Sequence, residues 1–335
     1  MRSTLRILIP IFTLTLFFGC NTVNSDLTIG FLMPDGEGSR WPTDLEYMQE
    51  AAEKYDATVI SKNANTDENL QIKQATEVLE AGVDVLVVVS VNANTAAAIV
   101  REAHNYNVPV IAYDRLIKNS DLDYYITFEG AQIAKLMVDH AIEKVPRGNY
   151  VMLWGDPGDV NAISIMNAQN EFLEPHINSG NINIVYKGFV DSWSAENAYH
   201  TMTRVLTMTD QKIDVVLTSY DGLARGALQA INEHPNQDIK VLTGQDAEIE
   251  ALKALLNDEL SLTVYKSIKT ISGSAMDLAA KLAKGEKITE ANATINNGRK
   301  EVPSIMLQPQ PVDKNSIRST VIADGYYTEE QVFGE

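Results

Sequence analysis

The chain is poor in the residues that build disulfides and metal sites: it has one cysteine and five histidines in 335 positions. A single cysteine, Cys20, excludes an internal disulfide and a CxxC redox pair, and structural zinc sites use several cysteines. The histidines form neither an HExxH motif nor a close pair, so a histidine-rich metal site is not expected. We therefore expect no metal and no cofactor.

Basic residues are also in the minority. Lys and Arg number 27 against 45 Asp and Glu, which gives a formal net charge of −18. An acidic surface repels phosphate backbones, so nucleic acid is excluded as a partner. It also repels anionic lipid headgroups, so any membrane attachment must be hydrophobic or covalent. The hydrophobic content of 45% is typical of a folded protein, and the length fits two domains.

No apolar run reaches the length of about 20 residues that crosses a membrane. Residues 7–18 are nearly all apolar and follow two arginines, which is typical of a secretory signal. Cys20 closes this segment after a glycine, as in the bacterial lipobox, although phenylalanines occupy the two positions where that motif prefers a leucine and a small residue. The alternative is a buried free cysteine. We expect a signal peptide over residues 1–20, lipidation at Cys20 and a polar tether over 21–26.

Strand and helix patterns alternate along the rest of the chain. Residues 27–33 indicate a strand and 41–55 a helix, while 83–91 form a continuous apolar run typical of a strand covered on both faces. Ser194 can cap the helix that follows it. Further elements are expected as a strand over 108–113 with a helix over 130–144 next along the chain, a helix over 160–178, and strands over 182–189, 241–245 and 262–265. The alternation restarts at about residue 130, without a Pro/Gly/Ser linker. These patterns predict an α/β fold of two doubly wound parallel-sheet lobes joined by a hinge of crossing strands.

Polar side chains follow the carboxyl ends of the expected strands, where open α/β sheets bind ligands. Two facing lobes would share a cleft that mixes cations, carboxylates and indoles, which suits a neutral sugar: hydroxyls both donate and accept, and C–H faces pack on indole rings. Any single such aspartate is more often a helix cap, and a single tryptophan is more often core. The residues at these ends are Arg40, Trp41, Asp114, Arg115, Asp156, Asp159, Asn161, Asp191, Trp193, Tyr220, Asp221, Asp246 and Lys266.

Several stretches resemble the type I periplasmic sugar-binding family, and its xylose-binding branch in particular. The similarity extends over residues 27–327, and it implies lobes joined by three crossovers that close on one monosaccharide and deliver it to an ABC permease. We also expect a monomer, and the signal-like segment predicts export to the periplasm or to the outer face of the cytoplasmic membrane. The stretches are RWPTD at 40–44, GVDVLV at 82–87, AYDR at 112–115, GQDA at 244–247, TVYK at 263–266 and NNGRKEVPS at 296–304.

The resemblance also assigns sugar contacts, with the two tryptophans on either side of a pyranose ring. At Tyr220 the chain departs from this branch, which has asparagine there, so a larger phenol offers one hydroxyl in place of an amide. We expect residues 27–128 plus 267–303 to form the N-terminal lobe and 129–266 plus 304–330 the C-terminal lobe. The matched contacts are Arg40, Trp41, Asp114, Arg115, Asn161, Trp193, Asp246 and Lys266.

Other functions fit less well. GxSxG, Walker A and GxGxxG motifs are absent, so we expect no enzyme, although Asp156 and Asp159 form a carboxylate pair of the kind that hydrolyses glycosides. The export signal and the lack of an N-terminal helix-turn-helix exclude a transcription regulator. A sugar-sensing co-receptor for a membrane histidine kinase would share the fold and ligand class, and the sequence does not separate it from an importer component.

Overall fold

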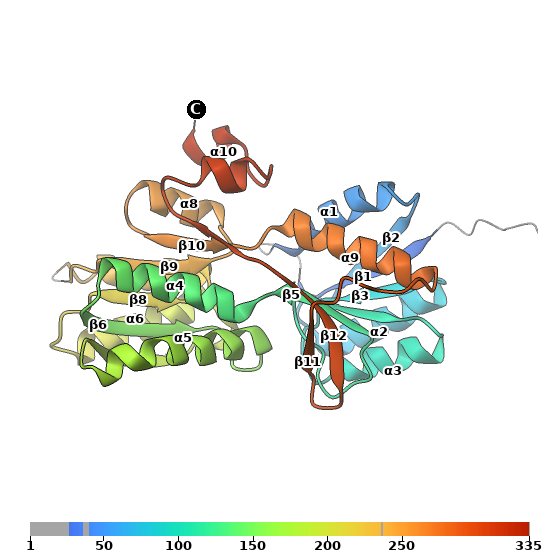
Figure 1. Ribbon diagram of the computed structural model, residues 1–335, viewed down its shortest axis with the longest axis horizontal. Helices are drawn as coiled ribbons and strands as arrows, with labels where there is room; N and C mark the ends of the chain where they lie inside the picture. Colours follow the sequence, from blue (N-terminus) through green and yellow to red (C-terminus); the bar gives the residue numbers. More distant parts are fainter. Residues whose placement is uncertain (1–26, 36–39, 236, 335) are drawn as a thin grey trace, which may run out of the picture.

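The computed structural model describes residues 27–35, 40–235 and 237–334, so the expected signal peptide, Cys20 and tether lie outside the described residues. Two α/β lobes lie side by side, and the chain crosses between them (Figure 1). The two-lobed fold predicted from the sequence is confirmed. Among the described residues, no helix combines the length and the apolar character needed to cross a membrane.

The N-terminal lobe contains a seven-stranded sheet in the order β11-β12-β5-β4-β3-β1-β2, parallel except for β11. Helices α1, α2, α3 and α9 belong to this lobe. The strands are β1 (Thr28–Met33), β2 (Thr58–Asn63), β3 (Val85–Val88), β4 (Val110–Tyr113), β5 (Tyr124–Phe128), β11 (Ala293–Asn296) and β12 (Glu301–Leu307), and the helices are α1 (Trp41–Glu53), α2 (Glu68–Glu80), α3 (Ala97–Asn105) and α9 (Ile268–Ala283).

The C-terminal lobe contains a six-stranded sheet in the order β13-β10-β9-β8-β6-β7, in which β13 alone runs antiparallel to its neighbour. Its strands are β6 (Gly148–Trp154), β7 (Ile182–Phe189), β8 (Val215–Thr218), β9 (Val241–Gln245), β10 (Leu262–Tyr265) and β13 (Gln310–Val312). Its helices are α4 (Gly130–Lys144), α5 (Val160–Asn178), α6 (Ala195–Met208), α7 (Asp221–Asn232), α8 (Ile249–Leu256) and α10 (Glu329–Phe333), with a 3-10 turn η1 (Asp191–Trp193) and a π-helical turn η2 (Arg318–Ile322).

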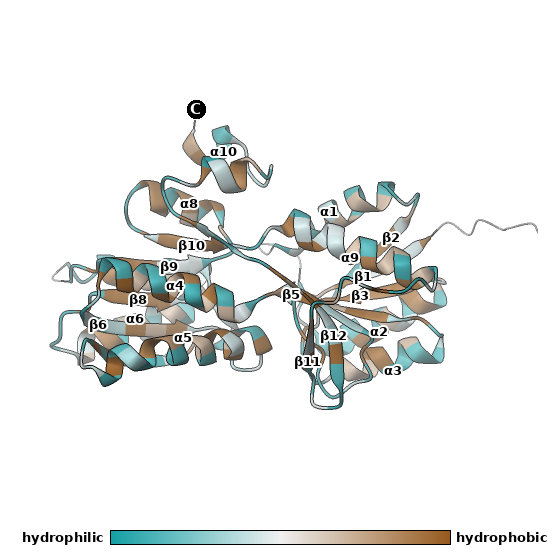
Figure 2. Cartoon of the chain, viewed as in Figure 1, coloured by the Kyte–Doolittle hydropathy of each residue, from teal (hydrophilic) through white to brown (hydrophobic). Residues whose placement is uncertain are grey.

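Burial and capping explain why these segments adopt these elements. All four residues of β3 are fully buried, and so are those of β4, as expected for parallel strands covered on both faces. Figure 2 shows hydrophobic residues concentrated on strands such as β8 and β10, while the helices present hydrophilic residues outward. Ser194 caps α6 by accepting a hydrogen bond from the Asn197 amide, as predicted.

The chain crosses between the lobes after β5, after β10 and after β12. The expected third boundary at residues 303/304 is wrong, because residues 304–307 pair in parallel with β5 inside the N-terminal sheet. The last crossing therefore lies at residues 308–309. The tail serves both lobes: β12 extends one sheet and β13 the other.

Candidate functional site

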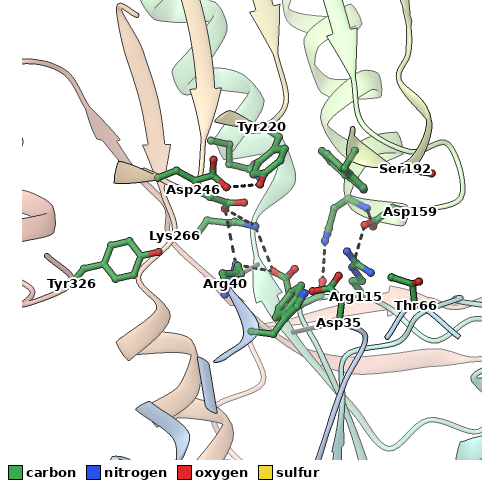
Figure 3. A pocket seen from close by; sticks show the side chains of 16 residues that line it. Asp35, Arg40, Thr66, Arg115, Asp159, Ser192, Tyr220, Asp246, Lys266 and Tyr326 are labelled. Atoms are coloured by element: carbon green, nitrogen blue, oxygen red, sulfur yellow. Dashed lines mark hydrogen bonds and ion pairs between the residues drawn. The ribbon is translucent and has the colours of Figure 1, made fainter. Parts of the chain in front are cut away.

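A cavity of about 410 Å³ lies between the two lobes, where the carboxyl ends of their strands face one another. Figure 3 shows side chains from both lobes turned into it. The eight matched contacts, Tyr220 and Asp159 all line this cavity, whereas three of the strand-end residues, Asp156, Asp191 and Asp221, do not. The lining consists of Asp35, Arg40, Trp41, Thr66, Asp114, Arg115, Asp159, Asn161, Ser192, Trp193, Tyr220, Gln245, Asp246, Glu248, Lys266 and Tyr326.

The backbone is left-handed at five positions in this lining. φ is +64° at Thr66, +60° at Asp114, +59° at Ser192, +53° at Trp193 and +94° at Asp246. Aspartate tolerates this region because its short side chain can bond locally, whereas tryptophan rarely adopts it. Such conformations cost free energy and persist where the surrounding structure enforces them. Here they turn a carboxylate or an indole toward the cavity at the end of a strand or turn.

Arg40 is anchored by a buried carboxylate one helical turn away. Its guanidinium donates to both carboxylate oxygens of Asp44, at 3.0 and 2.8 Å, and Asp44 also accepts a hydrogen bond from the Tyr113 hydroxyl at 2.5 Å. The Asp44 side chain is 0% exposed. Burial alone would lower the pKa of Arg40, but Asp44 and the nearby Asp114 and Asp246 outweigh it and raise that pKa. The arginine therefore stays charged in the cavity wall.

Lys266 lies between carboxylates from opposite lobes. Its Nζ is 3.5 Å from Oδ1 of Asp114 and 3.1 Å from Oδ1 of Asp246. Both oxygens are buried, and neither accepts a hydrogen bond from the described residues. Burial would raise the pKa of Asp114, but Lys266, Arg40 and Arg115 lower it further than burial raises it. Asp114 is thus an ionised acceptor, and each side of the cavity presents a carboxylate oxygen that can still accept a hydrogen bond.

A second set of contacts joins the lobes around Asn161. Its side-chain amide donates to the Asp114 carbonyl at 2.9 Å, and Arg115 Nε lies 3.6 Å from Oδ2 of Asp159. Asp159 also caps α5, accepting from the Asn161 backbone amide. Burial raises the pKa of Asp159, although Arg115 opposes the shift. These contacts place polar groups of both lobes within one hydrogen-bonded layer.

The two tryptophans have different surroundings. Trp41 is buried, and the guanidinium carbons of Arg40 and Arg115 lie 5.0 and 5.4 Å from its ring centroid, within the range of cation–π contacts. Trp193 is partly buried and packs edge-to-face with Tyr220, with ring centroids 6.1 Å apart. Each indole therefore reaches the cavity from a different lobe.

Tyr220 does not present a free hydroxyl proton to the cavity. The hydroxyl donates a short hydrogen bond to Glu248, which also lies 3.2 Å from the Arg225 guanidinium. Burial raises the pKa of Tyr220, and the Glu248 carboxylate raises it further, so the phenol stays neutral. Its oxygen can therefore accept a hydrogen bond from a ligand.

Six residues of the lining were named neither as strand-end residues nor as matched contacts. Gln245 lies within the motif at 244–247. Asp35, Thr66, Ser192 and Glu248 come two or three residues after the ends of β1, β2, β7 and β9, so the strand-end rule applies to them although they were not singled out. Tyr326 comes from the tail, where no strand-end pattern points to it.

The lining is suited to binding a neutral, polyhydroxylated molecule. It offers charged donors, carboxylate and amide acceptors, and aromatic faces in one cavity, and these are the groups that small-molecule sites use to fix the orientation of a ligand. Within the part of the chain that the structure describes, no cluster of three or more His, Cys, Asp or Glu side chains is arranged to hold a metal ion.

Comparisons with known proteins agree with this geometry. The model of the periplasmic binding protein domain matches residues 29–287. The chain is 37% identical to the D-xylose-binding periplasmic protein of Haemophilus influenzae, over 99% of both chains, and 36% identical to that of Escherichia coli, over 92% of this chain and 93% of that one. An ABC transporter solute-binding protein from Clostridium phytofermentans with bound β-D-glucose superimposes with a TM-score of 0.84 at 27% identity, covering 91% of this chain and 99% of that one.

Proposed function

Because the chain belongs to the type I sugar-binding group of the periplasmic binding protein family, we propose that it captures D-xylose or a close aldose between its lobes and delivers it to an ABC permease. One observation carries the proposal: Oδ1 of Asp114 and Oδ1 of Asp246 are buried on opposite sides of the cavity without a hydrogen bond from the described residues. Lys266 lies 3.5 and 3.1 Å from these two oxygens and offsets the cost of burying them, while their remaining lone pairs can accept hydrogen bonds from a ligand.

Sugar hydroxyls supply those donors. A hydroxyl that donates to Asp114 or Asp246 keeps its lone pairs, which can accept from Arg40 or Lys266. Each sugar hydroxyl would thus bridge a carboxylate and a cation that already lie within 4.0 Å of each other. Charge-assisted hydrogen bonds are the stronger ones, so the preformed pairs favour a neutral ligand with several hydroxyls.

We propose that Trp41 and Trp193 provide the apolar part of the site. The C–H faces of a pyranose would pack on the two indoles, which line the cavity from opposite lobes. Stacking requires a sugar ring whose hydroxyls are equatorial, so that they point away from the indoles and toward the charged and amide side chains of the cavity. This requirement favours xylose and its closest relatives over sugars that place a hydroxyl against an indole.

The mechanism we propose is hinge closure without a chemical step. A sugar that contacts both lobes binds the closed state better and shifts the population toward it. The closed lobes would then present the surface that the permease recognises. Small-angle scattering should show a smaller radius of gyration when saturating xylose is added. An unchanged radius of gyration would contradict this mechanism.

Calorimetry against a panel of aldoses tests the ligand. We expect D-xylose, or one close aldose, to bind at least tenfold more tightly than the others, because exchanging one axial for one equatorial hydroxyl unpairs a buried group at a cost of about 1–3 kcal/mol. Wild-type protein that binds none of these sugars would overturn the proposed function. Sugar-dependent capture by a detergent-solubilised permease, compared with a histidine kinase ectodomain, separates import from sensing.

We further propose that Cys20 carries a lipid anchor after export. The motif lies outside the described residues, so the proposal rests on its position after the signal-like segment. Cys20→Ser should release the protein from the membrane fraction and leave sugar affinity unchanged, because the tether precedes the first strand of the lobes. Wild-type protein that fractionates as freely soluble would show that this lipobox is not processed.

A further inference from the structure

The C-terminal segment reaches the cavity although it lies beyond the last strand of both sheets. It belongs to the C-terminal lobe, where α10 packs against α8. Tyr326 lines the cavity, and Figure 3 shows its hydroxyl turned toward Arg40 and Lys266. We propose that Tyr326 is a ligand-contacting residue that selects among sugars through its hydroxyl, held in place by residues 324–327; this rests on the proposed function.

A glycine turn points Tyr326 at the cavity. Gly325 has φ of +78°, and its amide and that of Tyr326 donate to Ile322 and Val321 carbonyls, each at 3.0 Å. Glycine adopts this left-handed conformation without the steric penalty that other residues pay. The chain thus reverses direction directly after η2, and the next side chain enters the space between the lobes.

Asp324 ties the segment to the second crossover between the lobes. Its Oδ2 accepts hydrogen bonds from the hydroxyls of Tyr265 at 2.7 Å and Ser267 at 2.6 Å. These two donors flank Lys266, whose ammonium lies in the cavity. One carboxylate therefore fixes both the residues around Lys266 and the turn that carries Tyr326.

The ring of Tyr326 is held by its aromatic neighbours. It stacks on Tyr265, with ring centroids 5.5 Å apart and an interplanar angle of 28°. It also packs against Tyr327, with ring centroids 4.3 Å apart. Tyr265 is 1% exposed, so one partner of the Tyr326 ring is itself fixed in the interior of the lobe. Tyr326→Phe preserves these ring contacts and removes the hydroxyl, together with the interaction of that hydroxyl with Tyr327.

The hydroxyl of Tyr326 has the chemistry needed to bind a neutral sugar. Burial raises its pKa, and Tyr327 raises it further, so the group keeps its proton at physiological pH. A tyrosine hydroxyl has one proton and two lone pairs. The contact with Tyr327 uses part of this capacity, and the remainder faces the cavity, where a sugar hydroxyl can pair with it.

The segment also contacts the other lobe. The Tyr47 hydroxyl of α1 donates to the Gly325 carbonyl at 3.2 Å. Tyr326 lines a second cavity of about 430 Å³ between α1 and the tail, so its ring forms the wall between that groove and the sugar cavity. A residue held from both lobes keeps its position relative to a ligand that also contacts both.

The test is calorimetry of wild type, Tyr326→Phe and Tyr199→Phe with D-xylose and its 2-, 3- and 4-deoxy analogues. Tyr199 is the matched control, because its hydroxyl bonds to Glu233 on the exposed surface. We expect Tyr326→Phe to bind xylose about tenfold more weakly, as for loss of one buried hydrogen bond. Tyr199→Phe should match wild type.

The deoxy analogues distinguish a ligand contact from a structural effect. For the one analogue that lacks the partner hydroxyl, Tyr326→Phe should cause little further loss, since the bond is already missing. An unchanged xylose affinity in Tyr326→Phe overturns the proposal, and so does an equal loss for every analogue, which would indicate a displaced segment. Wild type that binds no aldose overturns the proposed function and this proposal with it.

Discussion

The indole of Trp193 lies directly against Gly155. A Cβ placed on Gly155 would stand 2.2 Å from Cζ3 and Cη2 of the indole, far inside van der Waals contact. Gly155 follows β6 and Trp193 ends the turn η1, so two loops of the C-terminal lobe meet at this point. The position of one cavity wall therefore depends on a missing side chain.

Gly155→Ala should displace the indole and weaken sugar binding by about tenfold, since an aromatic contact is worth about 0.5–1.5 kcal/mol beyond its area. Gly273→Ala is the matched control, because a Cβ there meets nothing within 4 Å. Titration calorimetry of both variants measures the effect. Equal affinity in Gly155→Ala and wild type would show that the ring contributes nothing from its present position.

Trp193→Ala should weaken sugar binding by at least about tenfold, because it removes a stacking face and part of a ring of buried area, at about 25 cal/mol per Å². The variant also tests the previous prediction. If Gly155 acts only through the indole, the double variant Gly155→Ala/Trp193→Ala should bind no more weakly than Trp193→Ala. Additive losses would indicate that Gly155→Ala perturbs the lobe in another way.

Tyr220→Phe should weaken binding by about 1–3 kcal/mol, since a sugar hydroxyl and Glu248 both lose a partner in a partly buried site. The measurement is a xylose titration of Tyr220→Phe and Tyr220→Asn. If the phenylalanine variant binds xylose as tightly as wild type, the Tyr220 hydroxyl does not contact the sugar. Tighter xylose binding in Tyr220→Asn would indicate that the natural ligand is a related sugar.

Asp44→Asn should lower the free energy of unfolding by about 3 kcal/mol, because it leaves the Arg40 charge without its bidentate partner. The value is at the low end of the range for buried pairs, since Asp114 and Asp246 lie near the same guanidinium. Asp277→Asn is the control: its pair with Lys54 is exposed, so its loss should leave the free energy of unfolding nearly unchanged. Urea unfolding compares the three proteins.

Acidification should remove the contribution that ionised Asp114 makes to the free energy of unfolding. Its folded pKa is lowered below the unfolded value of about 3.9, so the contribution is fully present above that pH and is lost as the pH falls through the lowered pKa. The unfolding free energies of wild type and Asp114→Asn, measured from pH 7 to pH 2.5, should therefore differ at pH 7 and converge in acid. A difference that widens on acidification would contradict the assigned shift.

Periodicity and capping signals predicted much of the fold. Helix α5 and strands β7, β9 and β10 have the bounds expected from the sequence, because each is a sustained apolar pattern with a clear cap or turn. Strand β5 was missed, since it follows β4 through a loop without an intervening helix and so breaks the alternation. The misplaced third crossover has a similar cause: strand pairing, which local sequence does not encode, decides which sheet residues 304–307 join.

The candidate site was predictable where the strand-end rule applies. Asp114 and Asp246 directly follow the carboxyl ends of β4 and β9, and the two lobes face one another at these ends, so their meeting across the cavity follows from the fold. Tyr326 reaches the cavity from the tail, and its position depends on tertiary contacts such as that of Asp324 with Tyr265. Local patterns hold no information about contacts of that kind.

The backbone around the cavity also determines how the protein can diverge. Asp114 and Asp246 occupy left-handed backbone positions that few residue types tolerate. Most substitutions there would therefore destabilise the fold before they changed which sugar is bound. Tyr220 has φ of −163°, an extended conformation open to any side chain. Natural selection and directed evolution would therefore find new sugars most readily through Tyr220, while the two aspartates remain as inherited anchors for whichever sugar is adopted.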